Sequence, residues 1–372
     1  MNNENFKSYK KHLQNVLRID IIKLMANQTY FKERNYKNEK KIRELLNGLP
    51  PFCEDFFIGV ENNTSALTRL NYAYELRLFF DYLFNETNIF EGKNYQTLTP
   101  QNLNKIKTNT IERYISFIGN YEVDGKIFKN GENGKARKIA TLRSFFKYFF
   151  KRQLIEANVA ANVDIPKLHD KSIIRLEADE VAKFLDEAEY GDNLAGNAKA
   201  YHEHTRERDV ALLTTLLGTG MRISECVGLD VNDVDFEVGG LKITRKGGNQ
   251  VVLYFGDEIR RALLDWLKIR NHNPALAEEP ALFVSLQNKR ITPRAVQKLV
   301  KKYSQITTPL KHITPHKLRS TFGTALYQET NDIYIVADVL GHKDVNTTKK
   351  HYAAMSDEIR RNAAKKVHLR ED

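Results

Sequence analysis

Cysteine, tryptophan and long apolar runs are scarce in this sequence. Its only two cysteines, Cys53 and Cys226, are far apart, so they offer neither a disulfide framework nor a zinc-binding spacing, which fits a reducing compartment. No stretch reaches the roughly 18 apolar residues of a membrane span, and the polar start MNNENFKSYKKHLQ lacks the apolar core of a signal peptide. We therefore expect a cytoplasmic protein without a membrane span. A phosphate-binding P-loop and a carboxylate cluster suited to a metal are also missing, so no cofactor and no metal site are expected.

Positive charge, by contrast, is in excess. The 372 residues carry a formal net charge of +11 with a pI near 9.3, which favours a polyanionic partner because Lys and Arg gain affinity by releasing counterions from phosphates. Residues 1–170 hold 27 Lys and Arg against 19 Asp and Glu, whereas residues 171–372 hold 31 against 28. A solvated basic surface is the alternative. The larger excess of positive charge in the N-terminal half predicts that this half makes non-specific contacts with DNA.

The length predicts two domains, and apolar periodicity predicts that both are mainly helical. Residues 1–50 carry an apolar helical stripe that Pro50-Pro51 interrupts, and Asn63-Thr64-Ser65 is a plausible N-cap for a long amphipathic helix. Further helices are expected near residues 100–118 and 134–153, with a turn-rich stretch between them. The expected division is a helical arm at 1–55, a helical bundle at 56–165, a linker at 166–176, a second domain at 177–355 and a tail at 356–372.

One segment of the second domain departs from the helical pattern. GGLKITRKGGNQVVLYF contains two β-rich runs, 240–245 and 250–255, joined by a Lys-Gly-Gly-Asn turn, which predicts a β-hairpin. Upstream, a buried helix over Val210–Leu217 is expected to end at a Gly-Thr-Gly turn. The HEH at 202–204 invites a metal-binding interpretation, but adjacent rings on a helix chelate poorly, so a loop with solvated histidines is expected.

The helix at 134–153 combines an aromatic core stripe with basic residues. Two interpretations remain open: a solvated outer face of a bundle helix, or a surface that contacts DNA phosphates. Because the whole chain is basic, the second is preferred. Its candidate contacts are Lys135, Arg137, Lys138, Arg143 and Lys147.

The last 60 residues hold polar side chains suited to phosphodiester chemistry. His316 and Arg319 lie in HKLR, His342 in LGH and Tyr352 in TTKKHYA. Alone, this grouping could be a coincidence in a chain with 17 tyrosines and 10 histidines. It needs further members elsewhere in the sequence to be specific.

Two cations earlier in the chain complete the set. Arg222 lies in GTGMRISE, just after the Gly-Thr-Gly turn, and Lys246 lies in TRKGGN within the expected hairpin. In this order and in these local sequences, the six residues resemble those of the tyrosine recombinase (phage-type integrase) family. The resemblance covers roughly residues 60–355 and includes every catalytic position of that family.

The resemblance implies a mainly α, two-domain DNA clamp, in which a helical-bundle core-binding domain precedes a mostly α catalytic domain with a small β-hairpin or sheet. It implies cleavage and rejoining of double-stranded DNA at a specific site through a 3′-phosphotyrosyl intermediate, without metal or ATP. Family members act as homotetramers on paired sites and pass a C-terminal segment to a neighbour. The tail after Ser356 is therefore expected to dock in trans or to form a solvated terminal helix, and accessory DNA-bending or cell-division proteins are candidate partners.

Three of the six residues are suited to binding the phosphate. Attack on a phosphodiester adds negative charge to its non-bridging oxygens. Arg222 and Arg319 can clamp these oxygens with planar guanidinium groups, whose geometry Lys cannot reproduce, and His342 adds a further donor.

The other three are suited to proton transfer and bond formation. The Tyr352 phenol has an unperturbed pKa near 10, so it needs a base to attack at neutral pH, and His316 is the candidate. Lys246, on the hairpin tip, is the candidate acid that protonates the leaving 5′-oxygen.

Two details differ from the family pattern. Ser320 stands where many members have a second histidine, and Tyr352 follows His342 by ten positions where nine is commoner. Tyr327 and Tyr334 lie nearby, within apolar helical patterns, and are expected to be core residues.

The biological role has more than one interpretation. TRKGG, KYSQ and TPHKLR resemble single-component Xer-type recombinases of Gram-positive bacteria, which implies resolution of chromosome dimers before cell division. An integrase or excisionase of a prophage or conjugative element would use the same six residues. A type IB topoisomerase would share the chemistry but act without a defined site, and a non-catalytic DNA-binding protein would not need the intact set.

Overall fold

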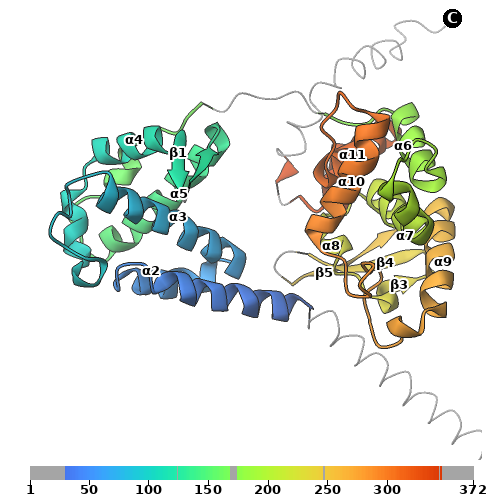
Figure 1. The fold of residues 1–372 in the computed structure, drawn as a ribbon, viewed down its shortest axis with the longest axis horizontal. Coiled ribbons are helices and arrows are strands. Elements are labelled where there is room, and N and C mark those ends of the chain that lie inside the picture. Colours follow the sequence, from blue (N-terminus) through green and yellow to red (C-terminus); the bar gives the residue numbers. More distant parts are fainter. Residues whose placement is uncertain (1–29, 124, 168–173, 246–247, 343, 346–372) are drawn as a thin grey trace, which may run out of the picture. The chain divides into compact units, whose positions relative to one another are not determined.

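The computed structural model describes residues 30–345 except 124, 168–173, 246–247 and 343. This part of the chain is mainly helical, with two small antiparallel sheets, and it divides into two compact units (Figure 1). The N-terminal unit comprises Phe31–Lys171, and the C-terminal unit includes the chain from Ser172 onward. Within the described ranges, every helix is too short or too polar to cross a membrane.

The N-terminal unit is a helical bundle with one β-hairpin. It is helical over 31–46 and then contains α2 (Cys53–Val60), η1 (Glu61–Asn63), α3 (Ala66–Asn85), η2 (Tyr95–Thr97), η3 (Pro100–Lys105), α4 (Thr108–Phe117), β1 (Asn120–Val123), β2 (Lys126–Lys129), α5 (Glu132–Lys151) and η4 (Val159–Asn162). Ser65 caps α3 as predicted, because its Oγ accepts a hydrogen bond from the Thr68 N–H at 3.2 Å. The helix predicted at 134–153 is α5.

The core of this unit is aromatic. Phe145 of α5 packs edge-to-face on Phe56 of α2, with ring centroids 5.2 Å apart, and Phe149 packs on Phe52 at 5.3 Å. Ile42 is buried in the same core. Residues 31–55 therefore pack within the N-terminal unit. The sequence pattern placed them in a separate arm that ends after Pro50-Pro51. In the structure this dipeptide joins two packed helices of the same unit.

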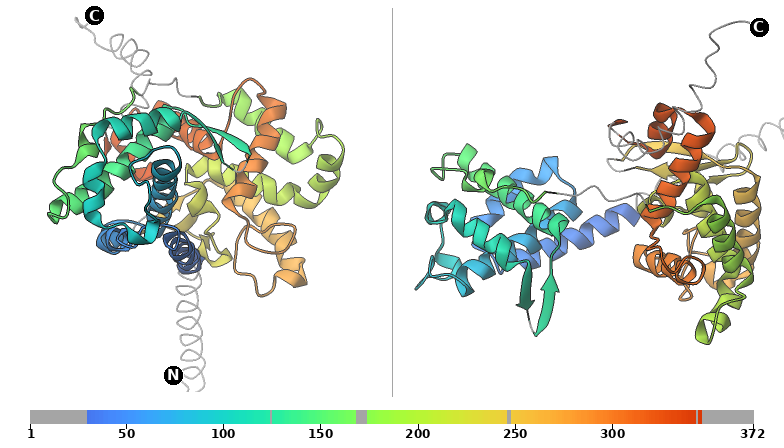
Figure 2. Two further views of the ribbon diagram at one scale, coloured as in Figure 1. Left: turned by 60° about the vertical axis from the view of Figure 1, so that its left-hand side comes forward. Right: turned by 90° about the horizontal axis from the view of Figure 1, so that it is seen from above.

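One local prediction in this unit is wrong. The helix expected over 100–118 is interrupted at Ile106, whose backbone is extended (φ −79°, ψ 124°) and whose side chain is fully buried. The stretch predicted to be rich in turns also contains two strands that were not predicted, β1 and β2, which pair antiparallel and project from the helices (Figure 2). Tyr121 stacks on Phe128 across them, with ring centroids 5.5 Å apart.

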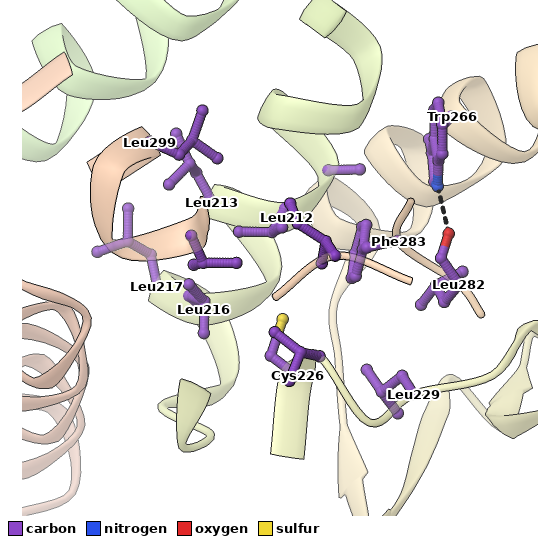
Figure 3. Packing of buried hydrophobic residues seen from close by; sticks show 14 of the residues in the cluster. Leu212, Leu213, Leu216, Leu217, Cys226, Leu229, Trp266, Leu282, Phe283 and Leu299 are labelled. Atoms are coloured by element: carbon purple, nitrogen blue, oxygen red, sulfur yellow. Dashed lines mark hydrogen bonds between the residues drawn. The ribbon is translucent and has the colours of Figure 1, made fainter. Parts of the chain in front are cut away.

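The C-terminal unit surrounds one central helix, α7. The described elements are α6 (Ala178–Tyr190), α7 (Asn197–Thr219), α8 (Ile223–Cys226), η5 (Val231–Asp233), β3 (Val234–Asp235), β4 (Gly240–Thr244), β5 (Gln250–Tyr254), α9 (Asp257–His272), η6 (Pro274–Leu276), α10 (Pro293–Thr307), α11 (Pro315–Thr330) and α12 (Ile333–Leu340). Helix α7 packs against α6, α9 and α11. Its apolar run, from Leu212 to Leu217, faces the core shown in Figure 3, where the Trp266 Nε1–H donates to the Leu282 carbonyl at 2.8 Å.

The histidines at 202 and 204 lie on α7 and not in the expected loop. His202 is buried, and its Nε2 lies 2.9 Å from the Ala188 carbonyl oxygen, so it is a core residue. Only His204 is exposed. The described residues include no group of His, Cys, Asp or Glu side chains arranged to hold a metal.

The predicted hairpin is confirmed as β4 and β5. They pair antiparallel with Thr244 opposite Gln250, so the connection between the two strands lies where the turn was predicted. A short strand, β3, pairs with the other edge of β4 and completes a three-stranded sheet in the order β3-β4-β5. The sequence pattern did not indicate β3, because a two-residue strand is too short to show alternation.

Candidate active site

The sequence Leu-Gly-His forms the C-terminal cap of α12. Gly341 has a left-handed backbone with φ of +63°, which favours glycine because a Cβ is strained there. The N–H of His342 donates to the Ala337 carbonyl at 2.9 Å, and the N–H of Gly341 donates to Asp338 at 2.8 Å. These two bonds form a Schellman motif, so the helix end itself fixes the backbone of His342.

Three arginines donate hydrogen bonds to the carbonyls at this helix end. The last carbonyls of a helix have no partner within it and carry partial negative charge, so guanidinium groups are suited to the position. The donors and acceptors are Arg245 to Val339 (2.8 Å), Arg319 to Leu340 and Arg222 to Gly341 (3.1 Å). Residues from three distant parts of the sequence therefore meet at the end of α12.

Arg222 is held by a buried carboxylate. Its Nη1 donates to Glu225 Oε1 at 2.9 Å, and its backbone N–H donates to Oε2 at 2.7 Å. The Glu225 side chain is 4% exposed, whereas that of Arg222 is 37% exposed. The carboxylate thus orients a guanidinium that still has an open face and donors for an incoming anion. Glu225 was not among the predicted site residues, although a glutamate three positions after Arg222 was visible in the sequence.

Arg319 lies on the second turn of α11. It is 6% exposed, and its Nη1 donates to the Gly220 carbonyl at 2.6 Å, so the same guanidinium joins the end of α7 to the end of α12. His316 is exposed and lies three positions earlier, on the same face of the helix. Ser320, at the position of the second histidine of many family members, donates its hydroxyl to the His316 carbonyl at 3.1 Å.

The structure therefore brings Arg222, Arg319 and His342 together and places His316 one turn from Arg319. Lys246 and Tyr352 lie outside the described residues. The strand that precedes Lys246 reaches the same helix end through Arg245, a residue that the sequence did not single out.

The two nearby tyrosines differ from each other. Tyr327 is half-buried and packs against the small cluster of Val336 and Leu340. Tyr334 is 71% exposed on the first turn of α12, so its prediction as a core residue is wrong. The apolar sequence IYIVADVL is buried on one face only, and Tyr334 lies on the other face.

The basic helix α5 offers fewer open cations than its sequence indicated. Lys138 is buried; its Nζ donates to Asn130 Oδ1 at 3.2 Å, and burial lowers the pKa of its ammonium group. Arg143 donates to three backbone carbonyls between residues 160 and 163. Both residues are therefore used inside the unit. The remaining candidates for phosphate contact are Lys135, Arg137 and Lys147.

Replacing Gly220 by Ala is expected to lower the melting temperature by about 5 °C, from a strain of roughly 1–3 kcal/mol. Its φ is +60°, and a Cβ would lie 2.3 Å from Cδ1 of Phe322. Gly92→Ala is the matched control, because Gly92 also has a positive φ but no atom within 4 Å of a new Cβ. Calorimetry of both variants separates the strain of the positive φ from the steric clash with Phe322. Equal decreases in melting temperature would show that the contact with Phe322 has no cost.

The C-terminal unit matches a known sequence family. Residues 175–358 match the Phage integrase family. The chain is 29% identical to a protein named tyrosine recombinase XerC from Caldanaerobacter subterraneus, over 98% of this chain and 96% of that protein. It is 32% identical to tyrosine recombinase XerC of Vibrio vulnificus, over 68% of this chain and 79% of that protein.

Solved structures share the fold of the chain. The XerH site-specific recombinase, in a post-cleavage complex with a palindromic difH substrate, superposes with a TM-score of 0.60 at 22% identity, over 81% of this chain and 80% of that chain. A lambda integrase tetramer bound to a Holliday junction gives 0.56 at 15% identity, over 81% and 75%. From its similarity to the Vibrio vulnificus recombinase over most of that protein's length, the chain belongs to the tyrosine recombinase family.

Proposed function

We propose that this protein is a site-specific DNA recombinase that cuts and rejoins DNA through Tyr352. The observation that carries the proposal is the meeting of Arg222, Arg319 and His342 at the end of α12 in a chain of this family. Guanidinium groups that are already oriented by carbonyls and by Glu225 stabilise a transition state without reorganising, and such preorganisation is commonly the largest contribution to catalysis.

In the proposed step, the phenolic oxygen of Tyr352 attacks the phosphorus while the bond from phosphorus to the 5′-oxygen breaks. His316 accepts the phenol proton, and Lys246 donates a proton to the departing oxygen. The products are a 3′-phosphotyrosyl link and a free 5′-hydroxyl. Because the link is itself a phosphodiester, the 5′-hydroxyl of another strand can reverse the step without ATP.

We assign the protein to the resolution of chromosome dimers in the cytoplasm, as a homotetramer on paired DNA sites. The similarity to one XerC protein over nearly the whole chain supports this role, and the lambda integrase tetramer on a Holliday junction supports the assembly for a protein of the same fold. Accessory DNA-bending or cell-division proteins remain candidate partners.

The tail at 356–372, which lies outside the described residues, is proposed to dock on a neighbouring subunit. Truncation after Ser356 is expected to reduce the tetramer recovered by crosslinking on paired sites more than it reduces binding to a single site. Unchanged tetramer recovery would contradict docking in trans.

Covalent capture tests the proposed function and its alternatives together. The full-length protein is incubated with fragmented genomic DNA and denatured, and the DNA that stays attached is sequenced at its ends. A recombinase is expected to give ends at one or a few sites, with the 3′-phosphate blocked by protein and the 5′-hydroxyl free. Ends spread over many sequences would indicate a type IB topoisomerase, and no attached DNA would indicate a non-catalytic binding protein. Ends that flank a mobile element would favour an integrase over dimer resolution.

Lys147, exposed on α5, is expected to contribute one phosphate contact. Lys147→Gln should weaken binding to all DNA sequences alike and reduce the slope of log K against log salt by about 1. Lys183→Gln on α6 is the control, because Lys183 is exposed but pairs with Asp179. Fluorescence anisotropy over a salt series measures both slopes, and equal slopes for the two variants would remove Lys147 from the proposed surface.

A further inference from the structure

Arg245, the residue that directly follows β4, ties the hairpin to α12. Its Nη2 donates to the Val339 carbonyl at 2.8 Å, and Nη1 and Nη2 each lie 3.4 Å from the Asp338 carbonyl oxygen. Its own backbone closes the hairpin turn, with its N–H donating to the Asn249 carbonyl at 2.8 Å and its carbonyl accepting from the Gly248 N–H at 3.0 Å. One residue is therefore bonded to both the turn and the helix end.

The contact between Arg245 and α12 is tight. A Cβ on Gly341 would lie 2.4 Å from Cζ of Arg245, so the guanidinium occupies the space that the missing side chain of Gly341 leaves. The Gly341 carbonyl accepts from Arg222, and His342 follows directly. The hairpin, the phosphate-binding arginine and the histidine thus share one helix end of a few residues.

This contact carries a free-energy cost. Arg245 Nε is buried and has no hydrogen-bond partner among the described residues. A buried donor without a partner is unfavourable, which offsets part of the gain from the other guanidinium bonds.

We propose that Arg245 is a positioning residue for departure of the 5′-oxygen, an inference that rests on the proposed function. Lys246 is the next residue in the chain, and consecutive Cα atoms are only about 3.8 Å apart. Holding Arg245 against α12 therefore restricts how far the Lys246 backbone can lie from the helix end where Arg222 and His342 act. Arg245 does not touch the reacting atoms; it limits the positions from which the general acid works.

The test uses two DNA substrates that differ at one atom. Suicide duplexes carrying the captured site are made with either the natural 5′-oxygen or a bridging sulfur at the scissile bond. A thiolate departs without a proton donor, because a thiol has a pKa near 8.5, far below that of an alcohol. A residue that positions the acid therefore matters for the oxygen substrate and not for the sulfur substrate.

Arg245→Met is expected to cleave the oxygen substrate about 10–100-fold more slowly than the unmodified protein, at saturating protein and with unchanged DNA affinity. On the sulfur substrate the two proteins are expected to agree within about 3-fold, because a sulfur leaving group does not need the acid that Arg245 positions. Arg245→Lys keeps the positive charge but not the planar, multi-donor geometry of a guanidinium. Its rate on the oxygen substrate should lie between those of Arg245→Met and the unmodified protein. Arg206→Met is the matched control, since Arg206 is an exposed arginine on α7 that pairs with Glu207, and it should behave like the unmodified protein on both substrates.

Two results would overturn the proposal. One is no loss of rate on the oxygen substrate. The other is an equal loss on both substrates, which would mean that Arg245 acts in phosphate binding or in folding. The ratio of the cleavage rate on the oxygen substrate to that on the sulfur substrate is also measured for Arg245→Lys. The outcome therefore does not depend on correct folding of Arg245→Met. If the unmodified protein cleaves neither substrate, the proposed function fails and the role of Arg245 fails with it, a result distinct from the two above because it appears without any substitution.

Discussion

Replacing Tyr352 by Phe is expected to abolish the covalent protein–DNA adduct while leaving DNA affinity unchanged. The substitution removes only the phenolic oxygen, which is the proposed nucleophile. The remaining phenyl ring has no nucleophilic atom that could attack the phosphorus. The substitution leaves Arg222 and Arg319 bonded to carbonyls at the end of α12, where we expect them to bind phosphate as before. The adduct is measured on suicide duplexes by its reduced mobility in denaturing gels.

Two other tyrosines provide the controls. Tyr334 is the stricter control because it is exposed on α12, within the same small part of the fold as His342. Tyr327 is half-buried, and its Phe variant tests whether loss of a hydroxyl in this region disturbs the site indirectly. Tyr334→Phe and Tyr327→Phe are expected to form the adduct at the unmodified rate. An adduct that persists in Tyr352→Phe, or disappears in Tyr334→Phe, would contradict the assignment.

Arg222→Ala is expected to slow cleavage at saturating protein by about 10²–10³-fold, the usual loss when one transition-state donor is removed. Its side chain is 37% exposed and its guanidinium is oriented by Glu225 and the Gly341 carbonyl, so we expect the donor to be in place before the phosphate arrives. Arg222→Lys restores the charge but not the planar fork and should recover only part of the rate. Single-turnover cleavage of the suicide duplex measures each rate.

The control for Arg222 is Arg206→Ala, which removes an equal charge from an exposed position on α7. It should cleave at the unmodified rate. If Arg222→Ala and Arg206→Ala slow cleavage equally, the effect comes from net charge and not from a placed donor. If Arg222→Ala lowers affinity but leaves the rate at saturation unchanged, Arg222 stabilises the bound DNA and the transition state equally and does not contribute to the chemical step.

Elements governed by local chemistry could be predicted from the sequence. Helix α5 has a strong aromatic stripe, Ser65 is a standard cap, and the Lys-Gly-Gly-Asn turn between β-rich runs determines the β4–β5 hairpin. The break at Ile106 could not be predicted, because an extended backbone there is stabilised by burial of the side chain in a core built from distant segments. The β1–β2 hairpin was missed although its Asp-Gly dipeptide between alternating residues was a usable signal.

The candidate site likewise contains residues that the sequence predicts and residues that it does not. Arg222, Arg319 and His342 have recognisable local sequences, and the structure brings them together. Arg245 was not predicted because its partner, Val339, lies 94 positions away and a backbone carbonyl leaves no mark in a sequence. Lys138 and Lys147 look alike in the sequence of α5, yet one is buried against Asn130 and the other is exposed, a difference set by tertiary packing.

Identification of the residue that carries the DNA is the most direct test of the central claim, which is that Tyr352 attacks the phosphodiester. The adduct from a suicide duplex is digested with nuclease and trypsin and sequenced by tandem mass spectrometry. The expected result is a phosphonucleotide on the peptide HYAAMSDEIR, residues 351–360, attached to its only tyrosine. Attachment to a peptide containing Tyr327 or Tyr334, or to any residue other than Tyr352, would contradict the claim.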